Sequence, residues 1–262
     1  MSTRHAASDE LRVRLEGEIA HYRLHRPSKR NALSDALVRS LHAAFSTPPK
    51  GAKVIVLSGE GAHFCSGLDL SEVRELTAAE GIAHSRMWHA AFDQIQFGTV
   101  PVIAVLHGAT VGGGLELAAS AHIRVAETTT FYGLPEGQRG LFTGGGGSAR
   151  IPRLIGTARM ADMMLTGRVF DAQEGHAAGL STYLVDPGRG LDKAFGIAAK
   201  VAANAPLTNF AVMHALPRIV DQSQSDGLFT ESLMAAIAQS DDAAKHRVRA
   251  FLEKKAGKIA KP

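Results

Sequence analysis

Two short apolar runs constrain the fold of this chain more than any other feature. Residues 54–57 read Val-Ile-Val-Leu and residues 101–106 read Pro-Val-Ile-Ala-Val-Leu, with no polar residue in either run. A strand with one face in water alternates apolar and polar side chains, whereas a continuous apolar run is typical of a strand buried on both faces. We therefore expect an α/β fold, in which helices cover both faces of a sheet.

The first residues predict a different kind of strand. Residues 11–15 alternate Leu, Arg, Val, Arg, Leu, and residues 19–24 resemble a second strand after a Glu-Gly-Glu turn. These features predict an opening hairpin. Ser34 and the apolar residues that follow it at spacings of four predict a capped helix that runs to Phe45.

The remaining chain alternates strand, loop and helix up to about residue 200 and is helical after it. We expect a third short strand at residues 123–126. Helices are expected within 78–97 and at about 112–121, 158–165, 172–178, 191–203, 207–220, 227–239 and 241–255. The sequence thus predicts an α/β core at residues 1–200 and a helical C-terminal region at residues 201–262.

Composition limits the class of protein. The 262 residues, 45% of them hydrophobic, suffice for a substantial core. The longest apolar run, residues 100–106, is far shorter than the ~18 residues of a membrane span, and the N-terminus is polar. A soluble, cytoplasmic protein with no membrane partner is expected. Cys65 is the single cysteine, so no internal disulfide can form.

The charge balance suits an anionic partner. The formal net charge is +4, and the pI is about 9.3, which fits either nucleic acid or a phosphorylated cofactor. Basic residues are scattered, except for a cluster near the C-terminus formed by Lys245, Arg247, Arg249, Lys254, Lys255 and Lys258. Only three tyrosines and one tryptophan could stack on bases, so we expect no nucleic acid. Because no histidines or carboxylates have metal-ligand spacing, we expect no metal.

Two expected strands run into glycine-containing loops. Residues 63–70 follow the first apolar strand, and residues 107–116 follow the second and include Gly112, Gly113 and Gly114. Glycine lets a backbone approach a ligand closely, and a helix N-terminus offers unpaired N–H donors. One donor from each loop could form an oxyanion hole. The triple glycine is equally well explained as a tight packing turn.

Two glutamates follow these loops. Glu116 lies on the first turn of the helix that the glycines open, and Glu136 follows a turn at residues 133–135. A pair of carboxyls can serve as general acid and base. Alternatively, Glu116 is an exposed carboxylate that compensates the helix dipole, and Glu136 is a turn or cap residue.

Five stretches of the sequence form an ordered set of motifs, at residues 24–33, 64–70, 112–117, 131–150 and 165–180. The first four resemble, in order, the segments Leu-Asn-Arg-Pro…Asn-Ala-Leu, Phe-x-Ala-Gly-x-Asp-Leu, Gly-Gly-Gly-x-Glu-Leu and Phe-Gly-x-Pro-Glu…Gly-Gly-x-x-Arg-Leu of the crotonase (enoyl-CoA hydratase/isomerase) family. The fifth also resembles a stretch of that family. The resemblance covers about residues 11 to 255.

The resemblance implies a crotonase-like spiral of ββα units with a helical C-terminal region. It implies that residues 201–262 form a trimerisation region, in a homo-oligomer that is a trimer or a dimer of trimers. The implied reaction is that of an enoyl-CoA hydratase, which adds water across the 2,3 double bond of a 2-enoyl-CoA thioester. The partner is then an acyl-CoA substrate, and no separate cofactor is expected because coenzyme A is part of that substrate.

The family's functional positions carry over onto matching residues. The oxyanion hole would be the N–H groups of Leu68 and Gly113, with Glu116 as general base and Glu136 as general acid. Coenzyme A would lie along Ser28, Lys29, Arg30, Ala32, Asp69, Leu70, Ser71, Lys254 and Lys255. The acyl pocket would include Gly144 and the helical residues Met87, Trp88, Phe92 and Phe97, although residues at helical spacing are as well explained as ordinary core.

The sequence departs from the family pattern at three places, one of which is residues 137–140, where Gly-Gln-Arg-Gly is more polar than usual. His25 stands where the family has asparagine or a similar residue, and residues 143–148 read Thr-Gly-Gly-Gly-Gly-Ser in place of Pro-Gly-Ala-Gly-Gly-Thr. Loss of proline and gain of glycine are expected to loosen that loop.

Other reactions stay open. Isomerases of the family often keep only the second glutamate, and the dehalogenase branch needs an aspartate in the glycine segment, which this chain lacks. Hydration is therefore favoured over a double-bond isomerase or a hydratase-lyase. A non-catalytic or RNA-associated crotonase-like protein is a further alternative, against which both glutamates argue.

Overall fold

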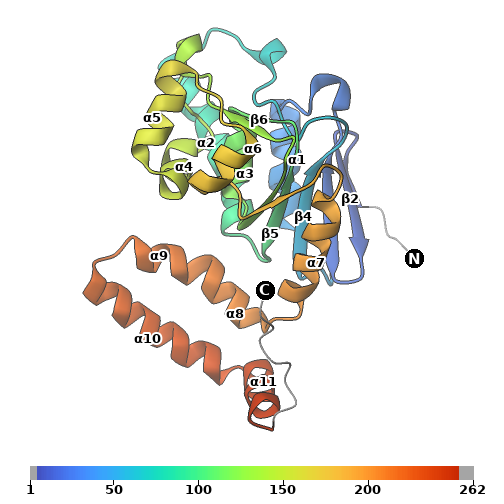
Figure 1. Ribbon diagram of the computed structural model, residues 1–262, viewed down its shortest axis with the longest axis vertical. Helices are drawn as coiled ribbons and strands as arrows, with labels where there is room; N and C mark the ends of the chain where they lie inside the picture. The colour runs from blue at the N-terminus through green and yellow to red at the C-terminus, as the bar shows by residue number, and fades with distance from the viewer. Residues whose placement is uncertain (1–4, 254–262) are drawn as a thin grey trace. The chain divides into compact units, whose positions relative to one another are not determined.

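The computed structural model describes residues 5–253, and they form two compact units that divide between Ala202 and Ala203. Figure 1 shows the order of the elements along the chain. The first unit is built on a sheet with strand order β1-β2-β3-β4-β5-β7-β9. These strands are β1 (His5–Ser8), β2 (Leu11–Glu16), β3 (Ile19–Leu24), β4 (Val54–Gly59), β5 (Val102–Leu106), β7 (Ile123–Glu127) and β9 (Tyr183–Val185).

The sheet changes from antiparallel to parallel at β3. β2 and β3 form the predicted hairpin, with Leu11 paired to Leu24 and Glu16 to Ile19. From β3 onward, each neighbouring pair of strands is parallel. The predicted α/β class and the hairpin are therefore confirmed.

Helices pack on both faces of the central strands. Val54 and Val56 of β4 lie in one core with Ala194 and Ala198 of α7 (Gly190–Ala202). Ile55 and Leu57 face the other way, into a core shared with α1 (Asp35–Ser46) and α2 (Ala78–Gln96). Successive strand residues point to opposite faces, which explains why the run is continuously apolar.

Capping residues fix where the first two helices begin. The Ser34 hydroxyl accepts a hydrogen bond from the N–H of Leu37, as predicted for the start of α1. Thr77 and Glu80 form a reciprocal capping box at the start of α2. The other helices of this unit are α3 (Gly113–Ser120), α4 (Gly147–Ile155), α5 (Thr157–Thr166) and α6 (Ala172–Ala178), of which α4 was not predicted.

A second, two-stranded sheet brings the two glutamate segments together. β6 (Ala109–Val111) and β8 (Phe131–Gly133) are parallel, with Val111 opposite Gly133. The N–H of Gly112 donates to the carbonyl of Gly133 at 2.8 Å. The chain that leads into α3 thus runs beside the chain that leads to Glu136.

The second unit is helical. It contains α8 (Pro206–Phe210), a π-helical turn (Ala211–Ala215), α9 (Leu216–Val220), α10 (Gln224–Ser240) and α11 (Asp242–Leu252). We expected one helix over 207–220, but Pro217 has no N–H to bond a carbonyl four residues earlier, and the α-helical pattern is interrupted just before it.

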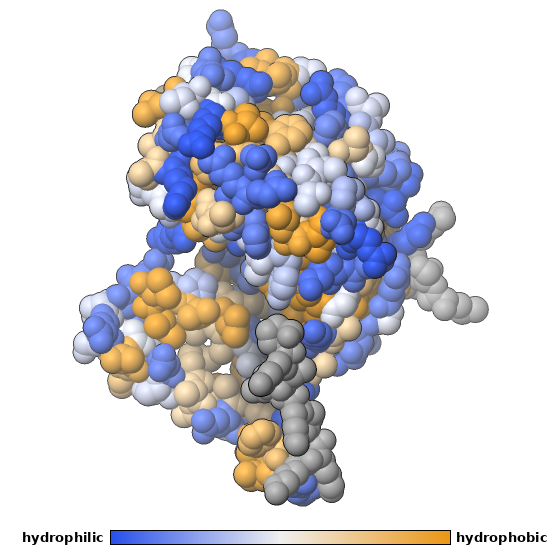
Figure 2. All heavy atoms as spheres, viewed as in Figure 1, coloured by the Kyte–Doolittle hydropathy of each residue, from blue (hydrophilic) through white to orange (hydrophobic). Residues whose placement is uncertain are grey.

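Exposed apolar side chains gather on this unit, as Figure 2 shows, among them Leu216, Phe229 and Leu233. Among the described residues, no helix is both long and apolar enough to cross a membrane.

Candidate active site

A cavity of about 370 Å³ in the first unit contains both predicted catalytic carboxyls. Its wall is formed by the segment after β4, by α2, by the start of α3 and by residues between 135 and 145. Leu68, Gly113, Glu116 and Glu136 all line it. The residues predicted for the oxyanion hole and for acid–base chemistry are therefore brought together in one place.

The N–H groups of Leu68 and Gly113 are both available on this wall. Leu33 pairs with the chain on either side of Leu68, because its N–H donates to Gly67 and its carbonyl accepts from Asp69. Successive N–H groups of an extended chain alternate in direction, so the Leu68 N–H faces away from Leu33. Gly113 is the first residue of α3, and its N–H has no carbonyl partner within that helix.

Gly67 lets these two backbone segments meet. It has φ +93°, and a Cβ there would lie 2.7 Å from the carbonyl oxygen of Val111 and 3.1 Å from the nitrogen of Gly113. A side chain at position 67 would therefore crowd both the Val111 carbonyl and the Gly113 nitrogen. Glycine is required for both its conformation and this close approach.

The triple glycine is demanded by packing as well. A Cβ at Gly113 would lie 2.7 Å from the Trp88 ring, and one at Gly114 would lie 2.3 Å from the carbonyl oxygen of Cys65. A Cβ at Gly112 would lie 3.0 Å from Oε1 of Glu136. Close packing therefore explains the triple glycine, and the same packing keeps the start of α3 beside Glu136.

Glu116 is buried, with 3% of its surface exposed. Its Oε1 accepts hydrogen bonds from the N–H groups of Gly145 and Gly147, each at 2.8 Å. Burial raises the pKa of Glu116 to about 7, against the N–H donors that favour the ionised form, and the nearby Glu136 charge raises it further. The alternative of an exposed, dipole-compensating carboxylate is therefore excluded.

The glycine segment that holds Glu116 is anchored on two sides. Ser85 of α2 donates to the carbonyl of Gly144 at 2.6 Å, and Arg150 donates to the carbonyl of Gly145 at 3.1 Å. A Cβ at Gly147 would lie 2.7 Å from Cγ of Glu116. Gly145, the glycine that stands where the family pattern has alanine, is also fitted closely, since a Cβ there would lie 3.2 Å from Oε2 of Glu116.

Glu136 is half-buried, and its carboxyl has fewer hydrogen-bond donors around it than that of Glu116. Its Oε2 is buried and has no hydrogen-bond partner within residues 5–253. Burial raises the pKa of Glu136, while the nearby Arg139 charge lowers it. A carboxyl in which one buried oxygen has no donor is suited to hold a proton there and deliver it.

Of the predicted coenzyme A residues, Leu70 lines the cavity. Ser28 and Lys29 lie on a 3-10 turn (Pro27–Lys29), with Arg30 exposed and Ala32 buried just after it. Lys254 and Lys255 lie outside the described residues. The coenzyme A contacts of this set stay predictions.

The Asp69 carboxylate is already bonded to other side chains of this protein. Its carboxylate pairs with Arg26 at 2.8 Å and accepts from the Ser71 hydroxyl at 2.6 Å. Hydrogen bonds from Ser71, then the Arg26 guanidinium, lower the pKa of Asp69 to about 2. These contacts hold the loop that carries Leu68.

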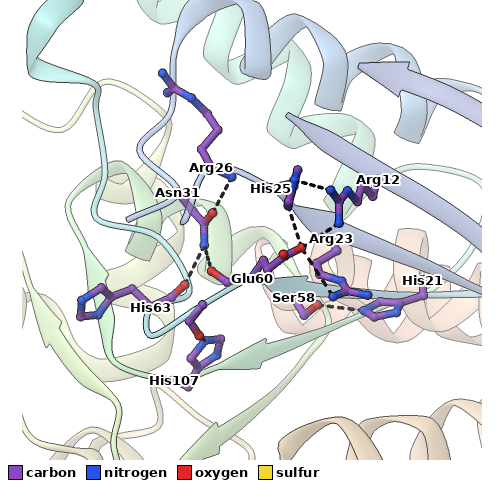
Figure 3. Close-up of polar contacts among 11 residues, drawn as sticks. Arg12, His21, Arg23, His25, Arg26, Asn31, Ser58, Glu60, His63 and His107 are labelled. Atoms are coloured by element: carbon purple, nitrogen blue, oxygen red, sulfur yellow. Dashed lines mark hydrogen bonds and ion pairs between the residues drawn. The ribbon is translucent and has the colours of Figure 1, made fainter. Parts of the chain in front are cut away.

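A buried asparagine that we did not predict braces the same loop, as Figure 3 shows. Asn31 Oδ1 accepts from the N–H of Arg26, and its Nδ2 donates to the carbonyls of Glu60 and His63. Asn31 also has φ +54°, which asparagine tolerates better than most residues. Beside it, His25 bonds the Glu60 carboxylate at 2.7 Å, which gives the unusual histidine a structural role.

The predicted acyl wall needs correction. Trp88 and Gly144 line the cavity. Phe92 has no exposed surface and lies in the core behind Gly145, and Met87 packs against the same core. Phe97 is the C-cap of α2, at the end of the helix. Helical spacing identified the correct helix but not which side chains reach the cavity.

Several lining residues were not predicted for the acyl wall, notably Leu141, Phe142 and Arg139, which follow Glu136 in sequence. Their position directly after a catalytic candidate was the signal that could have identified them. Among the described residues, no cluster of three or more histidine, cysteine or acidic side chains could hold a metal ion.

The same fold and sequence pattern occur in known proteins. A sequence model of the enoyl-CoA hydratase/isomerase family matches residues 14–260. A solved structure from Rhodopseudomonas palustris CGA009, assigned as an enoyl-CoA hydratase, is 55% identical, with a TM-score of 0.92 over 97% of this chain and 98% of that one. An enoyl-CoA hydratase structure from Bacillus anthracis is 28% identical, with a TM-score of 0.88 over 95% of this chain and 98% of its own.

A curated relative gives the same result. The short-chain-enoyl-CoA hydratase of Clostridium acetobutylicum is 29% identical over 92% of this chain and 93% of its own. These likenesses confirm the predicted crotonase-like fold, and the match of the family model extends over nearly the whole sequence. The chain belongs to the enoyl-CoA hydratase/isomerase (crotonase) family.

Proposed function

We propose that this protein is an enoyl-CoA hydratase, which adds water across the 2,3 double bond of a 2-enoyl-CoA thioester. The observation that carries the proposal is the pair Glu116 and Glu136, two carboxyls with raised pKa values on the wall of one cavity. The name of the Clostridium acetobutylicum relative supports a CoA thioester as the substrate class.

The proposed reaction divides the work between two carboxyls and two backbone donors. Glu116 accepts a proton from the bound water as its oxygen bonds to the β-carbon, and Glu136 gives a proton to the α-carbon. The charge that develops on the thioester oxygen is stabilised by the N–H groups of Leu68 and Gly113. One such donor typically contributes ~2.7–4 kcal/mol, and each positioned acid or base contributes about 10²–10⁴-fold.

Hydrogen bonding supports this assignment of roles. Glu116 has two N–H donors that favour its ionised form, and its pKa of about 7 suits a base that works near neutral pH. Glu136 Oε2 has no donor to hold a charge in the described part of the chain, which favours a proton-carrying acid. Coenzyme A enters as part of the substrate, so the two proton transfers need no separate cofactor.

The finer assignments are parts of the same proposal. We propose that Ser28, Lys29, Arg30, Ala32, Leu70 and Ser71 lie along the coenzyme A moiety. The helical C-terminal region is proposed to mediate homo-oligomerisation, because apolar side chains are exposed on it. We also propose that the protein works in the cytoplasm.

Loss of the conjugated-thioester absorbance tests the proposal. Wild type should hydrate a 2-enoyl-CoA, and Glu136→Gln should lower kcat by about 10²-fold or more, because Gln cannot supply the proton. The variant should retain its melting temperature and its affinity for a saturated acyl-CoA. Full activity in Glu136→Gln would refute the proposed role of Glu136.

A further inference from the structure

Five large apolar side chains line the same cavity as the two glutamates and yet are exposed. Leu70, Val73 and Leu76 come from the segment between β4 and α2, and Leu141 and Phe142 from the segment between Glu136 and α4. Phe142 is 69% exposed and Leu70 is 58% exposed. We call these five residues the apolar rim.

Exposed apolar side chains that lie together on one cavity indicate that an apolar ligand covers them. Single apolar residues on a surface are normal, whereas a contiguous patch marks a binding site. The apolar rim belongs to the cavity that contains Glu116 and Glu136, so a ligand that reaches the carboxyls can extend onto it. In the proposed hydration, C1 lies at the N–H donors and C2 and C3 lie between the carboxyls. Only C4 and the carbons beyond it are then free to reach the rim, and a four-carbon chain offers just one of them.

We propose that the apolar rim binds the distal part of an apolar acyl chain, so that this protein prefers medium- or long-chain acyl-CoA thioesters over four-carbon ones. The inference rests on the proposed function for the placement of C1 to C3. Each methylene moved from water onto the rim strengthens binding by up to about fourfold, the equivalent of ~0.8 kcal/mol.

The position of Arg139 favours a different ligand, an acyl chain that carries a carboxylate. On the cavity wall, Arg74 pairs with Glu80 at 3.5 Å and His84 with Asp35 at 2.8 Å. Arg139 has no ion-pair partner within the described residues, and could meet a carboxylate on the acyl chain. An exposed ion pair contributes little, while several methylenes on the rim contribute multiplicatively. An apolar acyl chain is therefore favoured over an acidic one as the ligand of the rim. The aliphatic part of the Arg139 side chain would lie beside it.

Binding of saturated thioesters tests the inference without requiring turnover. Butanoyl-CoA and decanoyl-CoA would be titrated calorimetrically into wild type, Phe142→Ala and Leu165→Ala. Leu165 is a matched control, because it is 83% exposed in the same unit and lies on α5, away from the cavity lining. Wild type and Leu165→Ala should bind decanoyl-CoA at least tenfold more tightly than butanoyl-CoA. Phe142→Ala should reduce that preference at least threefold.

Equal affinity for the two thioesters would overturn the inference, as would an unchanged preference in Phe142→Ala. If Phe142→Ala instead lowered the oligomeric mass and left the preference intact, the rim would be an interface between copies, and the inference would be wrong. Decanoyl-CoA preference in a protein that hydrates no enoyl-CoA would support the rim and refute only the proposed function.

A third ligand separates the acidic chain from the apolar one. Decanedioyl-CoA, with a carboxylate at the end of a ten-carbon chain, should bind more weakly than decanoyl-CoA. Tighter binding of the diacid, lost in Arg139→Gln, would overturn the apolar assignment and identify Arg139 as the specificity residue.

Discussion

The N–H of Gly147, the first residue of α4, donates a 2.8 Å hydrogen bond to the carboxylate of Glu116. A helix N-terminus stabilises a negative charge placed against it. α4 therefore lowers the cost of ionising a carboxylate that is otherwise buried, and it fixes the position of Glu116 in the cavity.

Gly147→Ala should damage the site without unfolding the protein. The new Cβ would lie 2.7 Å from Cγ of Glu116, so the carboxylate must move. We expect kcat for hydration to fall at least tenfold, since small displacements of a catalytic group have large effects. Gly196→Ala is the control, because nothing lies within 4 Å of its added Cβ in α7. Equal activity in both variants would refute the placement of Glu116.

The pH dependence of activity should follow Glu116. As the proposed base, it must be ionised in the free enzyme, and its pKa is about 7. The rate constant kcat/KM should therefore fall on the acid side with an apparent pKa near 7. An acid limb near the ordinary glutamate value would show that burial does not control this carboxyl, or that another group is the base.

The same raised pKa predicts how stability changes with pH. The pKa of Glu116 is about 7 in the folded protein and 4.5 in the unfolded chain, so the folded protein holds the proton more tightly. The free energy of unfolding of wild type should therefore fall as the pH rises from 4.5 through 7. Glu116→Gln has no charge to bury. Above pH 8 its free energy of unfolding should therefore exceed that of wild type by about 2–3 kcal/mol. The two proteins should converge near pH 4, as measured by urea denaturation. A pH-independent difference would contradict the linkage.

Arg150 is expected to act on Glu116 through the glycine segment. Its guanidinium bonds Asp93 and Gln96 of α2 and the carbonyl of Gly145, and its charge lowers the pKa of Glu116. Arg150→Met should lower kcat and move the acid limb of kcat/KM to higher pH. Arg150→Lys keeps the charge and should keep the limb in place. Identical pH profiles for all three proteins would remove Arg150 from this role.

Asn31 should be a stability residue rather than a catalytic one. Replacement by Ala leaves two partly buried carbonyls without their donor and puts alanine, which tolerates a positive φ less well than asparagine, at φ +54°. Asn31→Ala should lower the free energy of unfolding by about 2–4 kcal/mol. The exposed neighbour Lys29→Ala should change it by less than about 0.5 kcal/mol. Similar values for the two would show that the Asn31 contacts contribute little.

The sequence predicted the parts of the site that are local motifs. The glycines at 112–114, Glu116 and Glu136 each lie next to a recognisable strand or turn, and the resemblance to the crotonase family gave them their expected roles. β6 and β8 escaped prediction since three residues show no periodicity. They nevertheless decide that Gly112 and Glu136 are neighbours.

Other features depend on contacts between distant residues. The bond from Gly147 to Glu116 spans 31 residues, and no local pattern encodes it. Trp88 and Phe92 share one helix face, yet one lines the cavity and the other is covered by Gly145. Periodicity gives the direction of a side chain from its helix but not the depth of packing above it.

Isotope incorporation tests the central claim most directly. A 2-enoyl-CoA would be incubated with the protein in ²H₂¹⁸O, and the product analysed by mass spectrometry. Hydration predicts a 3-hydroxyacyl-CoA with ¹⁸O on C3 and one deuterium on C2, formed by wild type and lost in Glu116→Gln and Glu136→Gln. A product without ¹⁸O, such as a shifted double bond, would contradict the assignment of this site to water addition.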